Sequence, residues 1–167
     1  LRVLAGLQSC TGSVQLLDRA TQKHLEMVHG FKAPMDAIPM DDGSLLVAEI
    51  ATGSITRASG DSFATRTPLA SGLGGPVQMV LGPDGQLYVT EAAGNIQRID
   101  PKSGAKTQVA TGLALPEGLA FTPWGTLVVA EAAAGRLTEL DLANNQRRTV
   151  AEGLPIGLSA GPGMPPP

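Results

Sequence analysis

Short apolar runs recur along the chain and are separated by residues typical of tight turns. The clearest example is residues 76–113, in which apolar runs at 79–81 and 87–90 flank the turn Gly-Pro-Asp-Gly. Residues 96–100 alternate between apolar and polar, as a half-buried strand does, and 106–110 form a fourth run before Gly112. This pattern predicts one antiparallel sheet of four strands joined by tight turns.

The same pattern repeats about every 40 residues. Successive units open on prolines 42, 40 and 39 residues apart, at Pro34, Pro76, Pro116 and Pro155. In the three complete units a turn glycine follows the proline by nine residues and a glutamate follows that glycine by six. These residues are Gly43, Gly85 and Gly125, and Glu49, Glu91 and Glu131. Landmarks at fixed offsets indicate a repeat architecture in which each unit is one structural module.

The repeat divides a single domain, residues 1–167, into five segments. They are a partial blade at 1–31, whole blades at 32–73, 74–113 and 114–154, and the start of another at 155–167. Residues 12–31 align without a gap to 94–113, which assigns the first segment to the end of a unit. Strands are expected at 4–8, 36–39, 45–48, 54–58, 65–69, 118–121, 127–130, 136–141, 147–151 and 157–160. Pro68 falls in a fourth strand, which is typical of an outer edge.

Four-stranded units of this length predict an all-β fold, a β-propeller. Each sheet must cover its faces by packing on its neighbours, and radial stacking of four to eight blades does so. About four blades are visible in 167 residues. Residues 157–160 could complete the first blade and close a four-bladed ring. We favour a larger ring of six or seven blades, completed by further blades of the same polypeptide or by another chain.

Composition narrows the function classes. Hydrophobic residues make up 43% of the chain, enough for a core, and 12 basic against 15 acidic residues give a net charge of −3. No basic cluster exceeds Arg147-Arg148, which argues against nucleic-acid binding. No apolar run approaches the roughly 18 residues of a membrane span. A lone Cys10 cannot form an internal disulfide and says little about the compartment. Because propellers of this kind are common outside the cytoplasm in bacteria, we expect a periplasmic or secreted protein rather than a cytoplasmic one.

Candidate site residues lie where the chain enters each first strand, because in a propeller these loops surround the mouth of the central channel. Positions that differ from blade to blade are the better candidates for ligand binding. They are His29, Asp36, Gln78 and Glu117. Asp36, Glu91 and Glu117 could hold Ca²⁺ or Mg²⁺ through oxygen ligands.

The recurring glutamates have a structural alternative. A residue at the same place in every blade could accept hydrogen bonds from loop N–H groups, or pair with Arg57, Arg98 or Arg136 of a neighbouring blade. Trp124 replaces the aspartate of the Gly-Pro-Asp-Gly turn, on the opposite face. It could contact a partner or cover its own hairpin.

The blade pattern also resembles known families. Residues 116–141, with the pattern P-x-G-L-A-F-x-P-x-G-x-L-x-V-A-E followed by G-R-L-x-x-L-D, resemble NHL-type repeats and the regucalcin/gluconolactonase-like (SMP-type) propellers. The segment GPDGQLYVTEAAGNIQRID is similar to repeats of the streptogramin (virginiamycin B) lyases. These resemblances imply a binding platform, a metal-dependent lactonase, or a magnesium-dependent lyase.

The ligands of the two enzyme families are not matched. The place of the gluconolactonase-type asparagine, after the opening proline, holds Met35, Val77, Glu117 and Ile156. The place of the lyase histidine holds Ser44, Gln86 and Thr126. The sequence therefore favours a propeller that binds a protein or a small molecule on its channel-mouth loops. The alternative is a metal-dependent lactonase or related hydrolase, or a streptogramin-lyase-like enzyme.

Overall fold

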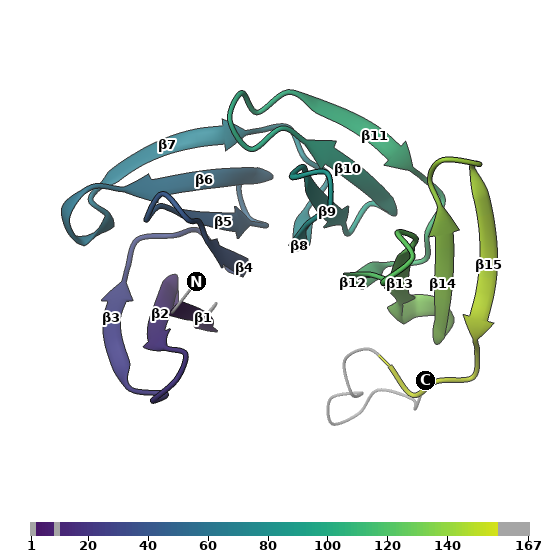
Figure 1. Ribbon diagram of the computed structural model, residues 1–167, viewed down its shortest axis with the longest axis horizontal. Helices are drawn as coiled ribbons and strands as arrows, with labels where there is room; N and C mark the ends of the chain where they lie inside the picture. Colours follow the sequence, from purple (N-terminus) through teal and green to yellow (C-terminus); the bar gives the residue numbers. More distant parts are fainter. Residues whose placement is uncertain (1–2, 9–10, 157–167) are drawn as a thin grey trace.

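The computed structural model describes residues 3–8 and 11–156, which form four antiparallel sheets arranged in an arc (Figure 1). Each sheet is a meander in which consecutive strands are hydrogen-bonded. The first sheet contains β1 (Val3–Gln8), β2 (Ser13–Asp18) and β3 (His24–Val28). The second contains β4 (Pro34–Pro39), β5 (Leu45–Glu49), β6 (Ser54–Ser59) and β7 (Thr65–Ala70).

The other two sheets repeat the second. The third contains β8 (Pro76–Leu81), β9 (Leu87–Glu91), β10 (Asn95–Ile99) and β11 (Lys106–Ala110). The fourth contains β12 (Pro116–Phe121), β13 (Leu127–Glu131), β14 (Arg136–Asp141) and β15 (Gln146–Ala151). Sheets of this kind stacked around an arc confirm the predicted propeller architecture.

The strands agree with the sequence pattern apart from single residues at several ends and larger differences at three starts. β4, β8 and β12 begin at the unit-opening prolines, two or three residues before the predicted starts, because the first residue of a strand tolerates proline. Pro68 lies in β7, an outer edge strand as expected. The pattern did not reveal two 3₁₀ turns of three residues each, η2 (Asp61–Phe63) and η3 (Ala132–Ala134). In the described ranges no helix is long and apolar enough to cross a membrane.

The arc is open. Strands β4, β8 and β12 lie on its inner side and β3, β7, β11 and β15 on its outer side, while the first and fourth sheets face each other across a gap (Figure 1). The described residues therefore do not form the closed four-bladed ring that we considered. The predicted strand at 157–160 and Cys10 lie outside the described residues.

The core consists of three apolar layers, one between each pair of successive sheets. Val14, Leu16 and Val28 pack against Leu45 and Val47 of the second sheet. The next two layers follow the same scheme, with Leu46, Ile55, Met79, Leu87 and Ile99 in one and Tyr88, Ile96, Leu119, Leu127 and Leu140 in the other. The second and third sheets thus turn one apolar face toward the preceding sheet and one toward the following sheet, as a propeller requires.

Cationic side chains tie successive sheets together at the outer rim. The Arg66 guanidinium donates to the carbonyl oxygen of His29 at 3.1 Å, across the first junction. Lys106 donates in the same way to Ser71, and Arg147 to Thr111. The three cations occupy equivalent register positions, opposite Ala58, Ile99 and Leu140. Each carbonyl belongs to the first residue after the outer strand of the preceding sheet.

A glycine marks the loop between the second and third strands of every unit. Gly12, Gly53, Gly94 and Gly135 recur every 41 residues and all have positive φ angles. Their backbones approach the chain so closely that an added Cβ would lie 2.6–2.9 Å from the carbonyl oxygen of Leu73, Leu113 or Leu154 in the last three cases. Glycine is therefore required at this fourth landmark of the repeat for two reasons: the positive φ angle, and the lack of room for a Cβ atom.

The residue before the opening proline of each of the three complete units adopts a left-handed conformation, and before Pro34 it is Ala33 (φ 50°). We expect Ala33→Gly to raise the free energy of unfolding by about 0.5–1 kcal/mol, because glycine removes the steric cost of a positive φ. Ala93→Gly, in a loop at ordinary φ, should lower it slightly. Urea titrations of both variants measure the difference, and destabilisation by Ala33→Gly would contradict the expectation.

Candidate functional site

The three repeating glutamates fix the loops at the channel mouth. Each accepts a hydrogen bond from the backbone N–H two residues before the unit-opening proline: Lys32 to Glu49, Gly74 to Glu91 at 2.8 Å, and Ala114 to Glu131 at 2.7 Å. Their exposed fractions are only 6%, 2% and 0%. The structural alternative, in which loop N–H groups donate to these carboxylates, is therefore confirmed.

Each glutamate also binds a side chain of the next strand of its own sheet. Thr56 donates to Glu49, Gln97 to Glu91 at 3.1 Å, and Thr138 to Glu131. Burial raises the pKa of Glu131, but hydrogen bonds from Arg136, Thr138 and the Ala114 N–H outweigh it and lower the pKa to about 2. Glu131 is therefore an ionised anchor rather than a proton-transfer group at neutral pH.

The predicted pairing of the glutamates with an arginine of a neighbouring blade is wrong, because the one such glutamate–arginine pair in the described ranges lies within a single sheet. Arg136 contacts Glu131 at 2.8 Å. Arg57 and Arg98 instead pair with the turn aspartates Asp42 and Asp84, at 3.2 and 2.9 Å. Arg57 and Arg98 lie on third strands, which are hydrogen-bonded to the second strand of the same sheet. This register places each arginine beside the turn that precedes the second strand, and so beside its aspartate.

Asp36 and Gln78 join adjacent inner strands. A carboxylate oxygen of Asp36 accepts from the Met79 N–H at 2.7 Å, and the Gln78 amide oxygen accepts from the Leu119 N–H at 2.5 Å. Both residues stand two positions after the opening proline, where the fourth sheet has Gly118. Burial raises the pKa of Asp36, although hydrogen bonds from the Met79 and Ala37 N–H groups oppose this. The structure thus gives these two candidates an inter-sheet role, and ligand binding by them remains a prediction.

Removing the Gln78 amide tests that role. We expect Gln78→Ala to lower the free energy of unfolding by about 1–3 kcal/mol, because the Leu119 N–H would remain between the sheets without an acceptor. Gln146→Ala, on an exposed outer strand, should change it by less than about 0.5 kcal/mol. Chemical denaturation measures both, and equal effects would show that the Gln78 contact contributes nothing specific.

Glu117 and His29 differ from the other candidates. Glu117 lies where the register of β12 against β13 shifts between Pro116 and Gly118, so it is the extra residue of a bulge. It is half-buried, and its carboxylate has no hydrogen bond or ion pair within the described part of the chain. His29 follows the outer strand β3 and is exposed at the rim, where its carbonyl binds Arg66. Bulges commonly redirect a side chain beside functional sites.

The structure does not bring the predicted metal ligands together. Asp36 and Glu91 direct their oxygens to N–H donors, as described above. Among residues 11–156, no three His, Cys, Asp or Glu side chains form a group suited to a metal ion. The residues in this part of the chain therefore do not fit a Ca²⁺ or Mg²⁺ site made by Asp36, Glu91 and Glu117.

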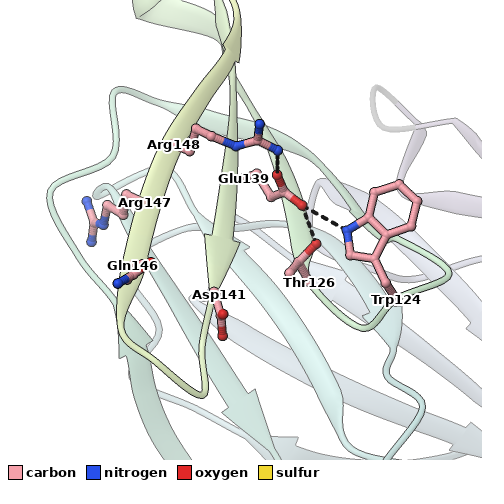
Figure 2. A pocket seen from close by; sticks show the side chains of 7 residues that line it. All are labelled: Trp124, Thr126, Glu139, Asp141, Gln146, Arg147 and Arg148. Carbon is pink, nitrogen blue, oxygen red and sulfur yellow. Dashed lines mark hydrogen bonds and ion pairs between the residues drawn. The ribbon is translucent and has the colours of Figure 1, made fainter.

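A second polar cluster, which the sequence reasoning did not assemble, surrounds Trp124 (Figure 2). The indole N–H donates to Glu139 at 3.0 Å, and the Glu139 carboxylate also accepts from Thr126 and Arg148. The Trp124 side chain is nevertheless 73% exposed and borders a hollow of about 250 Å³. In the repeat alignment Trp124 and Glu139 replace the Asp–Arg pairs Asp42–Arg57 and Asp84–Arg98. This replacement of both members of the pair was the feature of the sequence that could have revealed the cluster.

Comparison with known proteins identifies the architecture. No family model matches the chain, and no curated protein matches it in sequence. Solved structures match well. A gluconolactonase from Xanthomonas campestris is 21% identical with a TM-score of 0.75 over 93% of this chain and 62% of its own. A nidogen/laminin complex gives 21% identity and a TM-score of 0.78, over 92% of this chain and 61% of that one.

A catalytically inactive virginiamycin B lyase from Staphylococcus aureus, solved with quinupristin, matches at 16% identity with a TM-score of 0.73. The match covers 92% of this chain and 53% of the lyase, so the chain spans about half the length of that relative. At these identities the likeness concerns the fold. The chain is a partial β-propeller with the fold of these structures.

Proposed function

We propose that the protein is a binding platform, in which the channel-mouth loops receive a protein segment or a small molecule. The observation that carries the proposal is Glu117, the half-buried carboxylate on an innermost strand that has no partner in the described part of the chain. A carboxylate in this state favours a ligand that brings a hydrogen-bond donor or a cationic group.

The surrounding loops support a preorganised site. The glutamates at 49, 91 and 131 hold the entry loops to the second strands, and Ala92 and Ala132 donate backbone hydrogen bonds to Gly75 and Leu115 of those loops at 2.7 and 3.0 Å. Alanines at 92, 93 and 132–134 leave the loop tips small and without charge. Loops that are already fixed lose little entropy when a ligand binds.

The alternative is that the protein is an enzyme, and the names of several structurally similar proteins support this alternative. One of them is named a gluconolactonase and others are named virginiamycin B lyases. In the described half of such a ring the acidic side chains at the mouth are mostly engaged by backbone N–H groups. A reaction would therefore need groups from elsewhere in the ring.

The test is an NMR titration of the ¹⁵N-labelled chain with three probes: a small primary amine, gluconolactone and quinupristin. We expect saturable shifts centred on Glu117, Ala92 and Ala133, and roughly tenfold weaker binding by Glu117→Gln. The exposed control Glu152→Gln should bind normally. Shifts confined to other faces would overturn the proposal. Hydrolysis or ring opening of a probe that depends on added Mg²⁺ would establish the enzyme instead.

A further inference from the structure

The fourth sheet has an apolar face that no other described element covers. At the junctions that follow the second and third sheets the equivalent positions are closed: Leu46, Ile55 and Leu73 in the second sheet and Tyr88, Ile96 and Leu113 in the third are all 7% exposed or less. Their counterparts in the fourth sheet, Val128, Leu137 and Leu154, are only half-buried. Beside them Val150 is 43% exposed and Trp124 73% exposed. We call this the end face.

The first sheet shows the complementary opening. Leu17 occupies the register position of Ala58, Ile99 and Leu140, which are 0–2% exposed because each packs on the preceding sheet. Leu17 itself is half-buried, and Leu25 on β3 is 53% exposed. An apolar layer between two successive sheets has two sides, one from each sheet. The fourth sheet presents one of these sides at one end of the arc, and the first sheet presents the other side at the opposite end. We call this second surface the start face.

The polar contacts of the outer rim are also complementary. At each inner junction a cation on the outer strand reaches the first residue after the preceding outer strand. At the open ends the equivalent residues are His24, opposite Leu17 on β3, and Glu152, directly after β15. Both are exposed. A start face docked on an end face would bring an imidazole to a residue that offers a carbonyl and a carboxylate.

We propose that two copies of this chain close one ring, with the end face of each copy packed on the start face of the other. The described arc is open on one side (Figure 1), and the chain spans 52–53% of the length of the lyases that it matches. A twofold rotation about the channel axis then forms the same contact twice. Such a head-to-tail contact gives a closed ring of two copies, because applying the twofold rotation a second time brings the chain back onto itself.

The experiment is sedimentation equilibrium of the chain and of three Leu→Asp variants. The parent chain should be a dimer. Leu137→Asp on the end face and Leu17→Asp on the start face should each weaken dimerisation at least about 100-fold, since each buries a charge in the apolar layer. Leu115→Asp, on an exposed loop residue outside both faces, should leave it unchanged. Circular dichroism of each monomer checks that the sheets are folded.

Two further results decide the geometry. Because the proposed contact joins unlike faces, a mixture of Leu137→Asp and Leu17→Asp chains retains one parent junction. Native mass spectrometry should therefore show a mixed dimer that neither variant forms alone. A monomeric parent chain would overturn the proposal. So would a Leu17→Asp variant that remains fully dimeric, because it would show that two end faces pair with each other.

Discussion

Replacing Glu131 with alanine should lower the free energy of unfolding by about 3–5 kcal/mol. The carboxylate is fully buried and binds Arg136, Thr138 and the Ala114 N–H. Its removal leaves an uncompensated guanidinium and two unpaired donors at the point where the entry loop meets the sheet. Urea denaturation at neutral pH measures the loss. Asp41→Ala, at an exposed carboxylate in the turn before β5, should change stability by less than about 0.5 kcal/mol.

The effect of Glu131 should depend on pH in a defined direction. Its pKa in the folded protein is about 2, below the ordinary 4.5, so the charged form is favoured by folding. The stabilisation is complete above pH 4.5 and decreases as the pH falls toward 2, by up to about 3 kcal/mol. The stability difference between the parent and Glu131→Gln should therefore shrink over this range. A difference that stays constant down to pH 2.5 would contradict the assigned role.

The second large effect is expected at Gly94. Gly94→Ala should lower the free energy of unfolding by about 3 kcal/mol, because the residue has φ 93° and its new Cβ would lie 2.6 Å from the Leu113 carbonyl oxygen. Gly85→Ala is the matched control. Gly85 has φ 73° but nothing within 4 Å of the added Cβ, so only the conformational cost of about 1 kcal/mol applies. If both variants lost the same free energy of unfolding, the backbone around Gly94 would have moved to make room for the new Cβ, which would contradict the prediction.

The sequence predicted the fold well because its signals are local and repeated. The turn glycine, the apolar runs and the opening proline all act within a few residues, so the strands of the three complete units were found with small errors at their starts. Gly94 could also have been found, since its counterparts recur at a constant 41 residues. The 3₁₀ turn at Asp61–Phe63 has no equivalent in the other units, which is why the repeat gave no indication of it.

The candidate site was less predictable because its contacts join distant residues. Asp36 and Met79 are 43 positions apart, and no spacing in the sequence says that a side chain of one inner strand binds the backbone of the next. Offsets within a unit correctly placed Gln78 and Glu117 on innermost strands. They could not show that Gln78 is engaged whereas Glu117 is without a partner. That distinction depends on where each residue lies relative to the register shift after the opening proline, which recurs in β4, β8 and β12 and which only the strand pairing reveals.

The stacking of sheets in chain order has a consequence for the motions of the protein. Inner strand β8 contacts β4 on one side and β12 on the other, while the first and fourth sheets have a described neighbour on one side only. Local opening costs more where two layers must separate than where one must. Amide protons of the second and third sheets should therefore exchange with solvent most slowly in a monomeric variant such as Leu137→Asp, and local opening should begin at the first and fourth sheets.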